Sequence, residues 1–273
     1  MSNLLGAVEI REIAERIGVT PTKKLGQNFV IDANTCRRIV SIAEVGSDDV
    51  ALEIGPGLGS LTLALLEKAK SVVAVEIDNR LATELPETVK RHGFDLKNLT
   101  VVNSDAMQVS ELPVKPTVLV ANLPYNVSVP VLLRFLELFP TIKSGVVMVQ
   151  SEVADRLIAK PDTKEYGAPS AKANWWAALT SGGTVSRSIF WPVPNVDSSL
   201  VKFIRHAEPG DEELRMKTFE IIDQSFAKRR KMLRAALNGL VNESEIESAG
   251  IDPRVRGEVL ELSEFIKIAK ILK

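Results

Sequence analysis

The fold of this chain is decided by the segment Val50-Ala51-Leu52-Glu53-Ile54-Gly55-Pro56-Gly57-Leu58-Gly59. Its first five residues are apolar apart from Glu53, which is typical of a short buried strand. The glycines that follow permit a sharp backbone turn and let a ligand approach the main chain, so we count Gly55 and Gly57 as cofactor-binding candidates. Their spacing is Gly-x-Gly-x-Gly, not the Gly-x-Gly-x-x-Gly of dinucleotide folds, and a purely structural turn is the alternative.

Strands and helices alternate on the C-terminal side of this turn. The predicted strands are 50–54, 71–75, 99–103, 117–121 and 146–149, and the predicted helices between and after them are 61–66, 80–90, 129–138 and 152–159. Such alternation indicates βαβ units and therefore an α/β fold with a parallel, doubly wound sheet. The apolar spacing also predicts helices at 8–17 and 33–42, before the first strand of this sheet.

The strand signal stops near residue 205, and a different pattern follows. Helices are predicted at 214–226, 231–240, 243–249 and 263–272, after a linker at 207–210. We therefore expect two domains. We expect residues 1–205 to form an α/β domain with an N-terminal helical extension, and residues 206–273 to form a small all-helical domain.

The composition excludes several protein classes. The chain has 273 residues, of which 45% are hydrophobic and 25% charged, as in an ordinary globular protein. One cysteine, Cys36, and two separated histidines give neither a disulfide nor a metal site, so we expect no metal. No apolar run approaches the roughly 18 residues of a membrane span, and we expect a cytoplasmic monomer without a membrane partner.

The net charge of −1 argues against a nucleic-acid binder, but the charges are segregated. Between Phe226 and Arg234 there are five cations and no acid, whereas residues 208–213 hold four acids and no cation. Local fields matter more to a polyanion than the total charge. We predict that RNA phosphates contact Lys228, Arg229, Arg230, Lys231 and Arg234, and also Lys23 and Lys24 near the N-terminus; solvated surface is the alternative for both groups.

Two acidic residues follow the next two strands of the predicted sheet. Glu76 ends the second strand, where a carboxylate can accept hydrogen bonds from ribose hydroxyls. Asp105 follows the third strand and can accept from an adenine amine, although a helix cap is its alternative role. Because parallel strands end at one edge of a sheet, these residues and the glycine turn predict a nucleotide pocket. A ribose does not separate NAD from S-adenosylmethionine.

The segment Asn122-Leu123-Pro124-Tyr125 follows the fourth strand and favours amine chemistry. An aromatic amine is a poor nucleophile because its lone pair is delocalised into the ring. An asparagine oxygen and a main-chain carbonyl can accept its two hydrogens, while the tyrosine ring stacks on the base and tolerates a cationic methyl donor. We therefore take Asn122, Leu123, Pro124 and Tyr125 as catalytic candidates.

With these motifs in place, the chain resembles the small-subunit ribosomal RNA adenine dimethyltransferases. The N-terminal motif Gly26-Gln27-Asn28-Phe29-Val30 matches that family, and the motifs at 53–59, Glu76, Asp105 and 122–125 match it in order and spacing. The stretch Phe190-Trp191-Pro192-Val193-Pro194-Asn195-Val196-Asp197-Ser198 resembles the family's later loop, and 226–231 resembles its C-terminal basic helix.

The resemblance implies a Rossmann-like class I methyltransferase that uses S-adenosylmethionine, with cofactor contacts at Asn28, Val30, Gly55, Glu76, Asp105 and Asn122. It implies that residues 1–205 are the cofactor-binding catalytic domain and that residues 206–273 bind RNA or the ribosome. It implies that two adjacent adenines of a hairpin near the 3′ end of small-subunit RNA become N6,N6-dimethyladenine in a pre-ribosomal particle. The alternatives are a large-subunit adenine methylase of the macrolide-resistance type and a non-catalytic assembly factor. A dehydrogenase is weaker, since no hydride-transfer residue is apparent.

Three aromatic residues and the cysteine have competing roles. Phe190, in the later loop, is a further catalytic candidate that would stack on the target base opposite Tyr125, with core packing as its rival. For Trp175 and Trp176 we favour packing against a helix over RNA contact. Cys36 falls on an apolar helix face, which predicts a core position.

Overall fold

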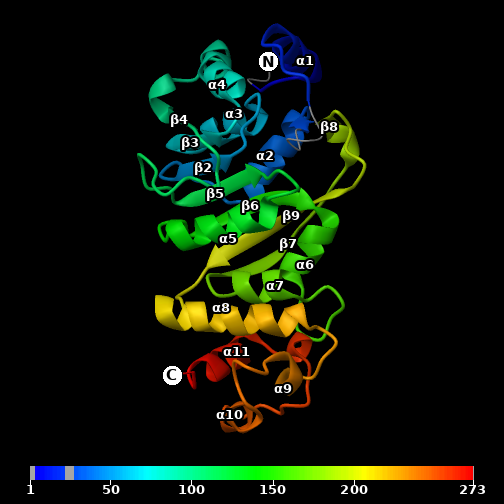
Figure 1. Ribbon diagram of the computed structural model, residues 1–273. Helices are drawn as coiled ribbons and strands as arrows, with labels where there is room; N and C mark the ends of the chain where they lie inside the picture. The colour runs from blue at the N-terminus through cyan, green and yellow to red at the C-terminus, as the bar shows by residue number, and fades with distance from the viewer. Residues whose placement is uncertain (1–3, 22–27, 273) are drawn as a thin grey trace. The chain divides into compact units, whose positions relative to one another are not determined.

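The computed structural model describes residues 4–21 and 28–272 (Figure 1). The strands are β1 (Phe29–Val30), β2 (Val50–Ile54), β3 (Ser71–Glu76), β4 (Leu99–Asn103), β5 (Val118–Asn122), β6 (Ser144–Gln150), β7 (Ala177–Val185), β8 (Phe190–Trp191) and β9 (Ser198–Arg205). The α-helices are α1 (Ala7–Arg16), α2 (Ala33–Ile42), α3 (Ser60–Leu66), α4 (Asn79–Arg91), α5 (Ser128–Leu138), α6 (Ser151–Ile158), α7 (Ala168–Ala173), α8 (Glu212–Ala227), α9 (Leu233–Ala236), α10 (Glu243–Ser248) and α11 (Leu262–Ala269). Short 3-10 helices lie at Leu96–Asn98, Arg187–Ile189 and Gly257–Val259.

The main sheet has seven strands in the order β4-β3-β2-β5-β6-β9-β7. From β4 through β3, β2 and β5 to β6, each strand pairs in parallel with its neighbour, as the alternating pattern predicts. The sheet is not wholly parallel, however, because β9 pairs antiparallel to β6, with Ser198 opposite Gln150.

Strand β7, one of the strands that the sequence analysis missed, has a weak local signal. Strand β7 contains Thr180-Ser181-Gly182-Gly183-Thr184, and glycine and serine are poor indicators of a strand. Gly182 is nevertheless required there, because a Cβ atom at that position would lie 2.8 Å from the Leu200 side chain. The close approach of the neighbouring strand therefore explains a composition that looks like a loop.

The central strands are buried on both faces. Val118, Leu119, Val120 and Ala121 of β5 are each at most 1% exposed, although successive side chains point to opposite faces. Helices α2 and α3 pack together over one face, where the fully buried Cys36 belongs to the core, as predicted. Helix α2 begins at the predicted place because Asp32 caps it, accepting a hydrogen bond from the Thr35 N–H (2.6 Å).

The chain divides into two compact units. One comprises the residues up to Ala154 together with Thr180–Arg205, and the other comprises Asp155–Leu179 together with the residues from His206 onward. One division between these units falls between Arg205 and His206, and residues 155–179 group with the C-terminal residues, although the sequence analysis placed them in the first domain. Trp175 and Trp176 explain this grouping, because both are buried and meet the Phe219 ring of α8 edge-on at centroid distances of 6.0 and 5.4 Å.

The basic run does not form a helix. Helix α8 ends at Ala227, residues 228–230 form a turn, and the predicted helix 231–240 shrinks to α9. The reason is tertiary: the N–H groups of Leu233 and Arg234 donate to the carbonyl oxygens of Val255 and Pro253. These bonds with a distant loop replace the helical bonds that would join the two predicted helices.

Within the described ranges, no helix has both the length and the apolar character needed to cross a bilayer.

Candidate active site

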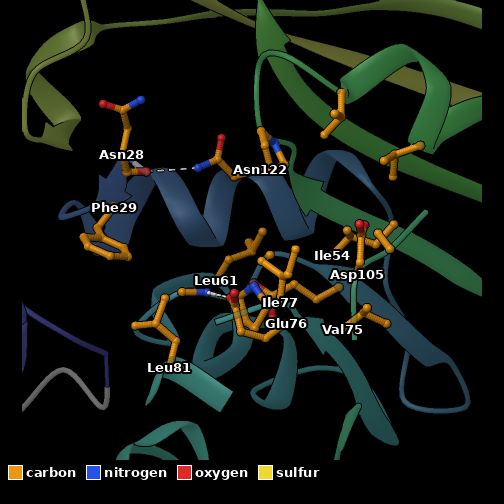
Figure 2. A pocket seen from close by; sticks show the side chains of 18 of the residues that line it. Asn28, Phe29, Ile54, Leu61, Val75, Glu76, Ile77, Leu81, Asp105 and Asn122 are labelled. Atoms are coloured by element: carbon orange, nitrogen blue, oxygen red, sulfur yellow. Dashed lines mark hydrogen bonds between the residues drawn. The ribbon is translucent and has the colours of Figure 1, made fainter. Parts of the chain in front are cut away.

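A cavity of about 300 Å³ lies at the carboxyl ends of β2, β3 and β5 (Figure 2). It is the kind of concave, mostly apolar space that small-molecule ligands occupy. The structure brings together in its wall all seven residues predicted to bind the cofactor, namely Asn28, Val30, Gly55, Gly57, Glu76, Asp105 and Asn122. Pro124 also lines it, whereas Leu123, Tyr125 and Phe190 do not.

Glu76 is fixed in this cavity by two backbone donors. Its Oε2 accepts from the Gly57 N–H (3.1 Å) and its Oε1 accepts from the Asp78 N–H (3.0 Å). Burial raises the pKa of the Glu76 carboxyl, and these two hydrogen bonds oppose the rise. A carboxylate has about four acceptor positions, so each oxygen keeps one for a ligand hydroxyl.

The glycine turn is needed both for its conformation and for the space that it leaves. Gly55 and Gly57 have φ angles of +70° and +58°, in the left-handed region that disfavours other residues. A Cβ atom on Gly57 would lie 2.9 Å from the Phe29 ring. The turn therefore packs directly beneath β1, and β1 carries the cofactor candidate Val30.

Asn122 stands at the end of β5 with its amide oriented by the main chain of Asn28. The Asn122 Nδ2 group donates to the Asn28 carbonyl oxygen at 3.2 Å, and Figure 2 shows this bond crossing the edge of the cavity. With the amide nitrogen engaged in this way, the Asn122 Oδ1 atom is left as an acceptor. The predicted acceptor for the target amine is thus held in one orientation.

Asp105 orders a local turn and also lines the cavity. Its Oδ1 accepts from the Met107 N–H (2.8 Å), which closes a local turn, yet its side chain also lines the cavity. The same hydrogen bond that orders the turn fixes the direction of the carboxylate.

Phe190 packs in the core, and the stacking hypothesis is wrong for this arrangement. Its side chain is 1% exposed and belongs to the main hydrophobic cluster, because β8 pairs with β1 and places Phe190 opposite Val30. A ring buried there cannot stack on an incoming base. Tyr125 differs, since it is half-buried in the turn before α5 and its hydroxyl lies 2.7 Å from the Ser198 Oγ.

Ile77 and Glu53 are among the lining residues that the sequence analysis did not propose as site residues. Ile77 follows Glu76 and is 55% exposed, an unusual exposure for isoleucine that provides an apolar surface at the cavity. The sequence feature that could have identified Ile77 is its position as an apolar residue directly after the acid that ends the strand. Glu53 is 1% exposed and accepts from the Thr62 hydroxyl (2.6 Å), while burial and nearby Glu76 raise its pKa to about 8.

The cationic residues predicted to bind RNA are only partly available. Arg229 pairs with Glu258 (2.7 Å), Arg234 pairs with Glu243 (3.0 Å), and the Lys228 Nζ donates to the Ala236 carbonyl oxygen (3.1 Å). Arg230 and Lys231 are exposed, and their side chains have no polar partner among the residues that the structure describes. Lys23 and Lys24 lie outside the described residues.

Comparison with known proteins identifies the family. Residues 19–273 match the family model described as "Ribosomal RNA adenine dimethylase". The chain belongs to this family. It is 59% identical to the Ribosomal RNA small subunit methyltransferase A of Leifsonia xyli subsp. xyli, over 97% of this chain and 98% of the relative. It is 56% identical to the protein of that name from Streptomyces griseus subsp. griseus, over 98% of this chain and 94% of that relative.

Solved structures agree with the sequence relatives. A dimethyladenosine transferase from Plasmodium falciparum superposes with a TM-score of 0.75 at 26% identity, over 88% of this chain and 95% of that one. The 23S rRNA methyltransferase ErmE superposes with a TM-score of 0.68 at 27% identity, over 90% and 99%. These findings confirm the resemblance, the class I methyltransferase fold, the dimethyltransferase activity and S-adenosylmethionine as cofactor.

The cavity fits this cofactor. Glu76 offers two acceptor positions to ribose hydroxyls, exposed Ile77 offers an apolar face to a base, and Asp105 can accept from an amine. The turn at Gly55 and Gly57 brings the backbone to the cavity without side chains. The residues present are thus complementary to the sugar, the base and the substituents of an adenosyl group.

Proposed function

We propose that this enzyme methylates the N6 amines of two adjacent adenines in a hairpin near the 3′ end of small-subunit (16S) ribosomal RNA, giving N6,N6-dimethyladenine. Relatives named as small-subunit methyltransferases at 53–59% identity support this target over a large-subunit one. The observation that carries the chemistry is the fixed amide of Asn122 at the edge of the cofactor cavity.

When bound, S-adenosylmethionine supplies an electrophilic methyl group on a sulfonium centre. The protein's task is to make the adenine amine nucleophilic. The Asn122 Oδ1 accepts one amine hydrogen, which favours the form whose lone pair is withdrawn from the ring. The Pro124 carbonyl oxygen already accepts from the Val127 N–H (3.2 Å), so we assign the second acceptor to the main-chain carbonyl of Leu123.

Tyr125 holds the base against these acceptors. Tyr125 follows Asn122 by three residues in the sequence. It is half-buried, so part of its ring remains able to stack on an aromatic base. Bases in a hairpin loop are already partly unstacked, so presenting one to the site costs less than from a duplex. With Phe190 in the core, the stacking role rests on Tyr125 in this arrangement.

We further propose that the enzyme acts as a cytoplasmic monomer on a pre-ribosomal particle. The exposed cations Arg230 and Lys231 support binding to RNA phosphates, which gives affinity without reading sequence. In this proposal the residues of the sheet-containing unit perform the chemistry, and those of the helical unit add affinity for the particle.

Substitution of Asn122 tests the proposal. Asn122→Ala should lower kcat on the order of 100-fold, because it removes an acceptor that matters most in the transition state. Mass mapping of the 3′ end of small-subunit RNA after single-turnover reactions measures the change. Cofactor affinity by calorimetry and particle binding are the controls for folding.

Three outcomes are informative. Loss of methylation with intact binding supports the assignment. Near-normal turnover by Asn122→Ala would move the chemistry to other residues. A wild-type protein that binds the particle but leaves the adenines unmodified would instead favour a non-catalytic assembly role.

A further inference from the structure

The hydroxyl of Tyr125 is tied to a residue far away in the sequence. Its Oη lies 2.7 Å from the Oγ of Ser198, a separation of 73 residues along the chain. Ser198 is the first residue of β9 and is 0% exposed. Two hydroxyl oxygens at this distance form an ordinary, well-formed hydrogen bond.

Ser198 is itself rigidly placed. It stands opposite Gln150 in the antiparallel ladder between β6 and β9. The preceding residue, Asp197, accepts from the Ser151 N–H through its carbonyl oxygen (2.9 Å). The partner of Tyr125 is therefore part of the sheet framework.

Tyr125, in contrast, sits in the turn between β5 and α5, where local anchoring is weak. The Ser128 hydroxyl donates to the Tyr125 carbonyl oxygen at 3.4 Å, and this long bond does not fix the ring. The ring can change direction about two side-chain torsions. The bond to Ser198 removes that freedom by fixing the ring's far end.

We propose that Ser198 is a positioning residue for methyl transfer: its hydroxyl fixes the Tyr125 ring in the direction that stacks the target adenine beside Asn122. This inference rests on the proposed function. Ser198 is the last residue of the stretch 190–198 that resembles the family's later loop. The inference gives this serine a role in the reaction although it does not contact the substrate. Burial raises the pKa of Tyr125, so its hydroxyl remains neutral at physiological pH and the tie is an uncharged hydrogen bond.

A double-mutant cycle tests the coupling. Ser198→Ala should lower kcat about three- to tenfold, the effect of one lost hydrogen bond, with the KM for S-adenosylmethionine unchanged. Tyr125→Phe keeps the ring, loses the hydroxyl and should give a similar fall. If the tie carries the effect, the double variant should be no slower than either single variant.

The neighbouring residue Ser199 provides a matched control. Ser199→Ala also removes a buried hydroxyl bond of similar length on β9, but this bond goes to Ser151 and not to Tyr125. Its kcat should stay within twofold of the wild type. An equal fall in Ser199→Ala, or effects of Ser198→Ala and Tyr125→Phe that multiply, would overturn the proposal.

Fluorine NMR gives a second readout that does not depend on activity. The chain has two tyrosines, so 3-fluorotyrosine labelling yields signals for Tyr125 and Tyr166, and Tyr125→Phe assigns them. Ser198→Ala should shift and narrow the Tyr125 signal as the ring gains motion, while leaving Tyr166 unchanged; Ser199→Ala should shift neither. Unchanged Tyr125 signals in Ser198→Ala would refute the tie even if the wild type had no methyltransferase activity.

Discussion

Two buried carboxyls in the cofactor cavity, those of Glu76 and Glu53, differ in their hydrogen-bond donors and therefore in their protonation. Glu76 accepts from two backbone N–H groups, whereas Glu53 has the Thr62 hydroxyl. Burial raises the pKa of both, but Glu53, with less compensation and with Glu76 nearby, reaches a pKa of about 8. Near neutral pH, Glu53 is therefore mostly protonated, while Glu76 is held by donors suited to its ionised form.

This difference predicts a pH dependence of stability. Because the folded pKa of Glu53 lies above its unfolded value, the folded state binds more protons between pH 5 and 8, and its contribution to stability falls as the pH rises. The slope can reach about 1.4 kcal/mol per pH unit. Glu53→Gln should flatten the curve, so that the variant gains stability relative to the wild type as the pH increases. Urea unfolding from pH 5 to 8.5 measures this; parallel curves would show that Glu53 does not titrate in this range.

Glu76 gives a prediction for cofactor binding. Glu76→Ala should weaken S-adenosylmethionine binding at least about tenfold, because charge-assisted hydrogen bonds are worth roughly 1.5–3 kcal/mol each. Glu76→Gln keeps one acceptor oxygen and should lose less affinity. Titration calorimetry compares the two variants, and the wild-type affinity in Glu76→Ala would remove this residue from the cofactor site.

At the scale of an element, the basic turn after α8 shows how folding places acidic partners beside a run of cations. The sequence contains no acid within the run, yet the fold brings Glu258 to Arg229 and Glu243 to Arg234. Arg229 also donates to the Lys164 carbonyl oxygen (2.6 Å), so it helps to hold the turn in place. We therefore expect Arg230 and Lys231 to make the principal phosphate contacts.

Salt dependence checks this division of roles. Each phosphate contact contributes roughly 0.7–0.9 to the slope of log affinity against log salt. Replacing both Arg230 and Lys231 by Gln should reduce the slope by about 1.5, without changing cofactor affinity. The control replaces Lys267 and Lys270, exposed cations in the last stretch of the same unit, by Gln and so matches the charge change. Equal slopes in the two double variants would leave the turn as solvated surface.

At the scale of the whole molecule, the division into units follows aromatic packing more than chain order. In the helical unit, Phe219 of α8 lies against Trp175 and Trp176, and the cations Lys172 and Arg215 stand over its ring at 5.1 and 5.4 Å. Tyr166 adds a hydrogen bond from its hydroxyl to the Leu260 carbonyl oxygen (2.9 Å). These contacts join residues 155–179 to the C-terminal helices.

Truncation of Phe219 should therefore destabilise the helical unit. Phe219→Ala removes the ring from this cluster and should lower the free energy of unfolding by about 2 kcal/mol, less than for a core ring because Phe219 is half-buried. In a Trp191→Phe background the remaining tryptophans, Trp175 and Trp176, both belong to this unit, so their fluorescence follows its unfolding. Cofactor affinity should not change, because all the cavity-lining residues belong to the other unit. A loss below 1 kcal/mol would show that the cluster adjusts to the truncation.

The sequence by itself determined the parallel half of the sheet and the composition of the cofactor cavity. Strands β2 to β6 are short, mostly apolar runs that are interspersed with periodic helices, and this pattern is local. The polar residues Glu76, Asp105 and Asn122 each end or follow a strand, and parallel topology brings such ends together. Their convergence in one cavity could therefore be predicted.

Only the tertiary structure decided the remainder. Strand β7 forms because β9 lies beside it, Phe190 enters the core because β8 pairs with β1, and the helix predicted after Lys231 is interrupted because Leu233 and Arg234 bond to a distant loop. The tie between Tyr125 and Ser198 likewise joins residues 73 positions apart. Each of these outcomes depends on a partner remote in the chain, and local periodicity and spacing carry no information about such partners.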